Sequence, residues 1–177
     1  EILSRPPAGL VEACGDVRGD LILLGVGGKM GPTMARMARR AFDQAGVRHR
    51  VIGVSRFRTP GLRERLETWG IETVACDLLD EQQVRNLPDA AEVIGMSGFK
   101  FGASERPDLA WATNCYMPAL ICRRYPQSRI VAFSTGNVYG LVPRSSGGST
   151  EDDPPRPDGE YAMTALGRER MYEYFSR

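Results

Sequence analysis

Histidine and cysteine are scarce in this sequence, which has one histidine and four cysteines among 177 residues. The cysteines form no C-x-x-C pair, and His49 alone cannot complete a cage of histidine and cysteine ligands. We therefore expect neither a zinc site nor another bound metal. The first ten residues lack the apolar core of a secretory leader, so we expect reduced, mostly buried cysteines in a cytoplasmic protein.

Long hydrophobic runs and an excess of charge of one sign are also absent. No apolar stretch approaches the roughly 18 residues that a membrane-spanning helix needs. Lysine and arginine number 23 against 22 aspartates and glutamates, which leaves a net charge of +1. No long-range field favours a nucleic acid or an anionic membrane, and we expect neither as a partner.

Apolar runs and helical spacing alternate along the chain. The expected strands cover residues 21–24, 51–54, 71–75, 91–96 and 129–133, and the expected helices cover 30–46, 61–69, 107–125 and a final stretch that begins near Asp158. This alternation predicts an α/β fold with a doubly wound parallel sheet. Pro118 is expected to kink or break the long helix. Residues 140–159, rich in Ser, Gly and Pro, predict a long surface loop.

A glycine turn, GVGGKMG, follows the first expected strand and opens a helix. In that context glycines let backbone N–H groups approach a pyrophosphate at a helix N-terminus. A phosphate loop of the G-x-x-x-x-G-K-[ST] kind is excluded, because Leu23 occupies its first glycine position. A turn that only packs strand against helix remains the alternative. The expected dinucleotide-binding residues of this turn are Gly25, Gly28, Lys29, Met30 and Gly31.

The end of the second expected strand indicates which dinucleotide binds. NAD-binding proteins place an acid there for the ribose hydroxyls, whereas this chain has Ser55 and Arg56. Arg56 can pair with a 2′-phosphate, so we predict NADP as the preferred cofactor and NAD as the second. A solvated Arg56 is the alternative. Asp77 can accept a hydrogen bond from the adenine amino group or serve as a helix N-cap.

Taken together, these features resemble the extended short-chain dehydrogenase/reductase family, the NAD(P)-dependent epimerases and dehydratases. The residues that carry the resemblance are the glycine turn, Cys76-Asp77-Leu78, Asn114, Phe133-Ser134-Thr135 with Val138-Tyr139-Gly140, and Glu151, Pro154 and Pro157 leading into Tyr161. They follow the family's order and spacing from residue 20 to about residue 177.

The resemblance implies a Rossmann domain over residues 20–177, preceded by an N-terminal extension over 1–19. It implies that Thr135 hydrogen-bonds a substrate oxygen and that Tyr161 acts as acid or base beside the cofactor. The further cofactor-binding residues implied are Leu78, Met96, Ser97, Gly98 and Asn114. Asn114 would otherwise be an ordinary residue of a helix surface. A homodimer paired through long helices is implied as well.

One position departs from the family's pattern, because Ala165 replaces the lysine of Y-x-x-x-K. Residues four apart share a helix face, so that lysine normally stands beside the tyrosine and favours its ionised form. A phenol in water has a pKa of about 10, which makes an unassisted tyrosine a poor base near neutral pH. Arg168 lies one turn beyond Ala165; a solvent-exposed arginine is its ordinary interpretation.

Two functions are consistent with these residues. The first is an NAD(P)-dependent oxidoreductase or epimerase that acts on a sugar-like hydroxyl or carbonyl of a small molecule. The second is a dinucleotide-binding sensor or interaction module with little or no activity, which Ala165 favours. The chain begins at Glu1 and ends at Arg177 inside a helical pattern. We therefore expect a domain truncated at its C-terminal end, with the substrate lobe largely absent.

Overall fold

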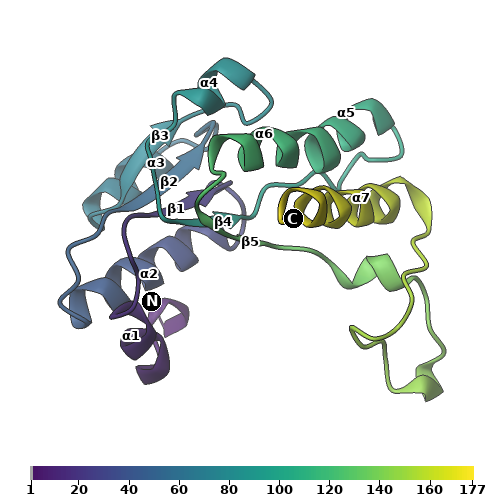
Figure 1. The fold of residues 1–177 in the computed structure, drawn as a ribbon, viewed down its shortest axis with the longest axis horizontal. Helices are drawn as coiled ribbons and strands as arrows, with labels where there is room; N and C mark the ends of the chain where they lie inside the picture. The colour runs from purple at the N-terminus through teal and green to yellow at the C-terminus, as the bar shows by residue number, and fades with distance from the viewer. Residues whose placement is uncertain (1) are drawn as a thin grey trace. The chain divides into compact units, whose positions relative to one another are not determined.

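The apolar runs of the sequence form a parallel five-stranded sheet (Figure 1). The computed structural model describes residues 2–177. The strands are β1 (Leu21–Leu24), β2 (Val51–Ser55), β3 (Glu72–Ala75), β4 (Glu92–Gly95) and β5 (Arg129–Ala132). Their order across the sheet is β3-β2-β1-β4-β5. The predicted fold class is confirmed, and each strand end lies within one residue of its predicted position.

The central strand is β1. Ile22, Leu23 and Leu24 are fully buried, as in parallel strands that are covered on both faces. β1 pairs in parallel with β2, where Leu23 faces Gly53, and with β4, where Leu23 faces Ile94. The strand order therefore reverses at β1, and in such sheets the loops at the carboxyl ends of the strands form the ligand site.

Helices connect the first strands and cover part of the core. α2 (Gly31–Gln44) follows β1, and α3 (Leu62–Thr68) follows β2. Their apolar faces meet in one core that includes Phe42 and Leu66. The segment ahead of β1 also contributes to this core. It forms a 3₁₀ turn, η1 (Ile2–Ser4), and a helix, α1 (Ala8–Cys14), both of which contact α2 (Figure 1).

A short helix, α4 (Glu81–Arg85), follows β3 and was not predicted. Its start is fixed by a reciprocal cap, in which the Asp80 carboxylate accepts the backbone N–H of Gln83 at 3.1 Å. The side-chain amide of Gln83 donates back to Asp80 at 2.8 Å. The spacing of a capping residue and a glutamine three positions later is the signal that could have revealed this helix.

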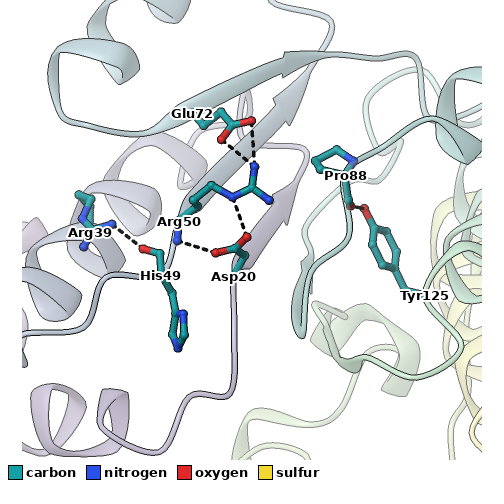
Figure 2. A network of polar contacts seen from close by, with 7 residues as sticks. All are labelled: Asp20, Arg39, His49, Arg50, Glu72, Pro88 and Tyr125. Carbon is teal, nitrogen blue, oxygen red and sulfur yellow. Dashed lines mark hydrogen bonds and ion pairs between the residues drawn. The ribbon is translucent and has the colours of Figure 1, made fainter.

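The amino ends of β1, β2 and β3 are tied together by charge (Figure 2). Arg50 donates its backbone N–H to Asp20 at 2.7 Å and its Nε to the same carboxylate at 2.6 Å. Its Nη1 lies 3.1 Å from Glu72, the first residue of β3. Beside it, Arg39 donates to the carbonyl oxygen of His49 at 2.7 Å. These bonds lie at the edge of the sheet opposite to the carboxyl ends of the strands.

The predicted long helix is interrupted. It consists of α5 (Pro107–Trp111), a π-helical turn η2 (Ala112–Tyr116) and α6 (Met117–Arg124). Pro118 has no N–H to offer to the carbonyl of Asn114, four residues back. The wider turn is therefore placed just before the proline, and the helix continues through it, so the predicted disturbance is a π-helical turn rather than a break.

The predicted surface loop separates two elements. A 3₁₀ turn, η3 (Gly136–Tyr139), precedes it, and α7 (Gly159–Phe175) follows it, with Asp158 at the N-cap position as predicted. Within the loop, η4 (Arg144–Ser146) forms a single 3₁₀ turn, and most side chains there are exposed.

The described chain divides into two compact units. The sheet unit comprises the residues up to Ser97 together with Arg124–Val131, and the helix unit comprises Gly98–Arg123 and Ala132–Arg177. The domain limits taken from the sequence, 1–19 and 20–177, stay a prediction. Across residues 2–177, no helix combines the length and apolar character that crossing a membrane requires.

Several buried side chains resist ionisation. Burial raises the pKa of the Cys76 and Cys122 thiols to about 11 and that of Tyr125 to about 12. Tyr125 is 3% exposed and donates its hydroxyl to the carbonyl oxygen of Pro88 at 2.9 Å (Figure 2). As pH rises, the unfolded chain releases these protons while the native state keeps them. The native state therefore loses stability relative to the unfolded chain.

We predict that the free energy of unfolding falls as pH rises above about 9, because unfolded thiols and phenols release their protons near pH 8.5 and 10. Urea unfolding between about pH 8 and 11 measures this fall. Tyr125→Phe should show a shallower fall than the parent, by roughly 1 kcal/mol at about pH 11. Tyr174→Phe, at a residue that is 70% exposed, should keep the parent slope. Identical slopes in all three proteins would contradict the prediction.

Candidate functional site

Two glycines of the turn between β1 and α2 serve the fold. Gly25 has a φ of +94°, and a β-carbon there would lie 2.3 Å from Oγ of Ser97. A β-carbon at Gly31 would lie 2.2 Å from the carbonyl oxygen of Val26. Both glycines therefore allow backbone segments to approach closely. Close packing of the turn, the alternative considered from the sequence, is enough to explain a glycine at these two positions.

Gly28 has no such packing role. Within the described chain, a β-carbon there would meet only the carbonyl oxygen of Gly25, at an ordinary 3.4 Å. Gly28 is exposed, and so are its neighbours Lys29 and Met30. Met30 is the N-cap residue of the 14-residue helix α2. Exposed backbone at the N-terminus of a long helix suits an anion, so the open side of the turn fits a pyrophosphate.

The end of β2 lies against this turn. A β-carbon at Gly27 would lie 2.3 Å from Oγ of Ser55. The next residue, Arg56, places its Nη1 3.5 Å from Oδ2 of Asp77, and the two side chains are 52% and 40% exposed. An exposed ion pair of this kind stabilises a protein by about 0–1 kcal/mol. A dianionic phosphate can therefore compete with Asp77 for the guanidinium of Arg56.

Asp77 does not cap a helix, which corrects one of the two roles considered for it. The N-cap of α4 is Asp80, whereas Oδ1 of Asp77 accepts the backbone N–H of Leu79 at 3.1 Å. Leu78 is 7% exposed, so its side chain belongs to the core. Cofactor contacts of Asp77 and Leu78 stay predictions.

The end of β4 joins the same region of the sheet unit. The backbone N–H of Met96 donates to the carbonyl oxygen of Leu24 at 2.9 Å, which extends the pairing of β4 with β1. Ser97 follows, and its backbone N would lie 2.9 Å from a β-carbon at Gly25. The structure thus brings together the predicted residues of the glycine turn, of the ends of β2 and β4, and of the segment after β3.

In the helix unit, Tyr161 lies in the first turn of α7 and is half-buried. Nζ of Lys100 lies 4.9 Å from the centroid of its ring. Ala165, one turn further along α7, is fully buried. Sequence reasoning missed Lys100, because no local spacing links position 100 to position 161.

Asn114 organises the segment that carries Lys100. It is fully buried in the π-helical turn. Its Oδ1 accepts the backbone N–H of Phe99 at 2.9 Å, and its Nδ2 donates to the carbonyl oxygen of Phe99 and to Oγ1 of Thr164, both at 2.9 Å. Both amide hydrogens are thus bonded within the protein. The interpretation of Asn114 as a helix-surface residue is wrong, and a contact with cofactor stays a prediction.

Thr135 occupies the N-cap of η3 and is half-buried. Its Oγ1 donates to Oδ1 of Asn137 at 3.0 Å and accepts the backbone N–H of Asn137 at 3.3 Å. η3 contacts α7, the helix of Tyr161. A hydroxyl that donates to a substrate oxygen would have to leave Oδ1 of Asn137. The catalytic roles of Thr135 and Tyr161 stay predictions.

Arg168 is 7% exposed, so the expected solvent-exposed arginine is wrong. A β-carbon at Gly98 would lie 2.6 Å from Nη1 of Arg168 and 3.3 Å from Oδ1 of Asn114. The guanidinium therefore packs against the backbone of Gly98, and a larger residue there would have to displace it. Seven residues separate Arg168 from Tyr161, which is about 10 Å along a helix.

Comparison with known proteins gives a family match. The model of the NAD dependent epimerase/dehydratase family matches residues 21–177. No curated protein matches the sequence.

Solved structures share the fold. They include MoeE5 in complex with UDP-glucose and NAD (TM-score 0.73, 23% identity, 89% of this chain). The UDP-Glc/GlcNAc 4-epimerase of Campylobacter jejuni matches with a TM-score of 0.72 and 17% identity over 90% of this chain. The UDP-glucuronic acid 4-epimerase of Bacillus cereus, in complex with NAD, matches with a TM-score of 0.70 and 18% identity over 88%. The chain spans about half the length of these proteins, namely 49%, 49% and 52%.

We predict that Gly28→Val weakens dinucleotide binding by at least about tenfold and leaves the circular dichroism spectrum unchanged, because the added side chain occupies the open side of the turn. Gly31→Ala should instead lower the thermal stability, since its β-carbon meets backbone. Gly9→Ala, in α1 with nothing within 4 Å, is the neutral control. Titration of each variant with reduced dinucleotide, followed by fluorescence, measures binding. Parent-like affinity of Gly28→Val would place the ligand elsewhere.

Proposed function

The chain belongs to the NAD-dependent epimerase/dehydratase family, and we propose that it acts in the reversible oxidation or epimerisation of a sugar-like hydroxyl or carbonyl. The observation that carries this proposal is the open glycine turn. Gly28 is exposed and has no packing role there, while Gly25 and Gly31 are fixed by the fold. The UDP-glucose named with MoeE5 supports a nucleotide sugar as the substrate class.

The residues present fit a dinucleotide cofactor. Gly28, Lys29 and Met30 would hold the pyrophosphate, while Ser55 and Arg56 would hold the adenosine ribose and its phosphate. When bound, the cofactor supplies a nicotinamide ring that accepts or donates a hydride.

Residues of this chain carry out the proton transfer. Tyr161 gives a proton to the substrate oxygen when a carbonyl is reduced and takes one from it when a hydroxyl is oxidised. Thr135 donates a hydrogen bond to the same oxygen, exchanging its bond to Asn137. In this role Thr135 orients the oxygen, and Tyr161 exchanges the proton.

NADP is the proposed preferred cofactor, on the ground of charge. The end of β2 itself has no acid, and the ion pair of Arg56 with Asp77 is exposed, so a 2′-phosphate would have to displace the Asp77 carboxylate from Arg56. MoeE5 and the Bacillus cereus enzyme were solved with NAD, so NAD is the alternative.

A second candidate function is dinucleotide binding without efficient chemistry, as in a sensor or an interaction module. Ala165 is the observation that favours it, because α7 offers no amine one turn beyond Tyr161. Homodimer formation and cytoplasmic localisation stay predictions under either function.

We predict that NADPH binds more tightly than NADH by roughly tenfold or more, because a charge-assisted hydrogen bond contributes about 1.5–3 kcal/mol. Arg56→Glu should reverse this order. Arg58→Glu, two residues along the same exposed segment, is the matched charge control and should keep the parent order. Fluorescence titration of the three proteins with each cofactor gives the dissociation constants, and an NADH-favouring parent would refute the preference.

We predict that Tyr161→Phe lowers the turnover of UDP-sugars by at least about 100-fold, because the substrate oxygen loses its proton donor and acceptor. Tyr174→Phe, at an exposed position of the same helix, should turn over like the parent. Absorbance of the reduced cofactor and chromatography of the sugar product measure the rates. A parent that binds dinucleotide yet turns over no sugar would favour the binding module. Full activity of Tyr161→Phe would remove that residue from the mechanism.

A further inference from the structure

Lysine is rare in this chain, which makes the position of each one informative. The sequence has only Lys29 and Lys100 among its 23 basic residues. Lys29 lies in the glycine turn of the sheet unit. Lys100 lies in the helix unit, in the segment after β4, and its ammonium is 4.9 Å from the centroid of the Tyr161 ring.

Hydrogen bonds of the buried Asn114 hold the backbone next to Lys100, whereas the Lys100 side chain is itself exposed. Asn114 pairs with both the N–H and the carbonyl of Phe99, the residue before Lys100. The same Asn114 donates to Thr164, which lies on α7 one turn beyond Tyr161. The buried side-chain amide of Asn114 thus links the backbone next to Lys100 to the helix that carries Tyr161. Breaking these hydrogen bonds would cost free energy, because buried polar atoms would lose their partners.

The backbone after Lys100 turns back at once. The N–H of Ala103 donates to the carbonyl oxygen of Lys100 at 3.2 Å, and Gly102 has a φ of +86°. Hydrogen bonds therefore hold the backbone both before and after Lys100. They fix the point beside α7 from which the lysine side chain extends.

We propose that Lys100 is a positioning residue that provides, across the helix unit, the positive charge that Ala165 cannot provide within α7. This inference rests on the proposed function, in which Tyr161 exchanges a proton with the substrate. A cation over a phenol ring attracts the negative face of the ring, and it attracts the ionised phenolate more strongly, because an opposite charge favours the charged form.

Other ionisable groups on or beside this part of α7 have different contacts. Glu160 accepts the indole N–H of Trp111 in α5 at 2.9 Å. Cys115 of η2 places its sulfur 3.5 Å from the carbonyl oxygen of Thr164, and burial raises its pKa. Glu169 contacts Ser134, ahead of η3. η3, which contains Tyr139, also contacts α7, and Arg168 of α7 is buried.

The ionisation of Tyr161 itself tests the proposal without any need for turnover. The chain has six tyrosines, so labelling with tyrosine that carries ¹³C at Cζ gives a small set of resonances, and Tyr161→Phe identifies the one from Tyr161. Its chemical shift is followed with pH in the parent, in Lys100→Met and in Lys100→Arg. Arg170→Met, which removes one positive charge from an exposed position of α7, is the matched control.

Lys100→Met should raise the midpoint of the Tyr161 titration by roughly half to one pH unit, a threefold to tenfold loss of tyrosinate at a given pH. Lys100→Arg should restore the parent midpoint, and Arg170→Met should leave it unchanged. An unchanged midpoint in Lys100→Met, or an equal rise in Arg170→Met, would overturn the proposal. A rise of the parent midpoint in about 1 M salt supports it, because an exposed charge is screened. The parent midpoint also tests it if Lys100→Met does not fold, since a salt-insensitive midpoint would overturn it.

The result separates this inference from the proposed function. A midpoint that depends on Lys100 in a chain that turns over no sugar would support the pairing of Lys100 with Tyr161 and refute the catalytic role. If the chain turns over sugars and the midpoint of the Tyr161 titration does not change in Lys100→Met, the catalytic role is supported and the pairing of Lys100 with Tyr161 is refuted. Where turnover is found, its pH profile in the direction that needs a base should shift to higher pH in Lys100→Met by the same amount as the resonance.

Discussion

The pairing of β1 with both β2 and β4 is the constraint on which the other features depend. A strand that is apolar on both faces is covered by other elements on both faces. Its neighbours are parallel to it and need crossover connections, so β2 and β4 come from different parts of the chain. The turns that follow β1, β2 and β4 then leave the sheet at one edge, where the glycine turn meets Ser55 and Ser97. At the opposite edge, Arg50 fixes the amino ends of three strands by charge.

The glycine turn must satisfy two demands at once, and different residues satisfy them. A chain that passes from a buried strand into a helix within six residues brings backbone against backbone, so Gly25 and Gly31 cannot carry a β-carbon. Gly28 is free of that demand and lies at the surface. A glycine at such a position leaves room for a ligand to come close to the backbone.

The helix unit depends on one buried side chain. An amide in an apolar interior must form its hydrogen bonds there, and Asn114 does so with Phe99 and Thr164. The π-helical turn, which Pro118 favours, places Asn114 where it reaches both. The family's usual arrangement sets amine and phenol on one helix, four residues apart, so that helix geometry alone fixes their distance. Here Lys100 and Tyr161 meet across two segments, and the distance depends on tertiary hydrogen bonds.

The sequence by itself determined the strands, the long helices, the parallel direction of the strands and the place of the glycine turn, because apolar periodicity and glycine context are local signals. It missed α4, although Asp80 and Gln83 carry a capping signal, since the helix is too short for periodicity to show. Only the tertiary structure decided that Asn114 and Arg168 are buried, that Asp77 pairs with Arg56, and that Lys100 lies over Tyr161. These contacts join residues between 15 and 70 positions apart. Spacing along the chain specifies a face of a helix or strand but not which distant side chain will pack against it.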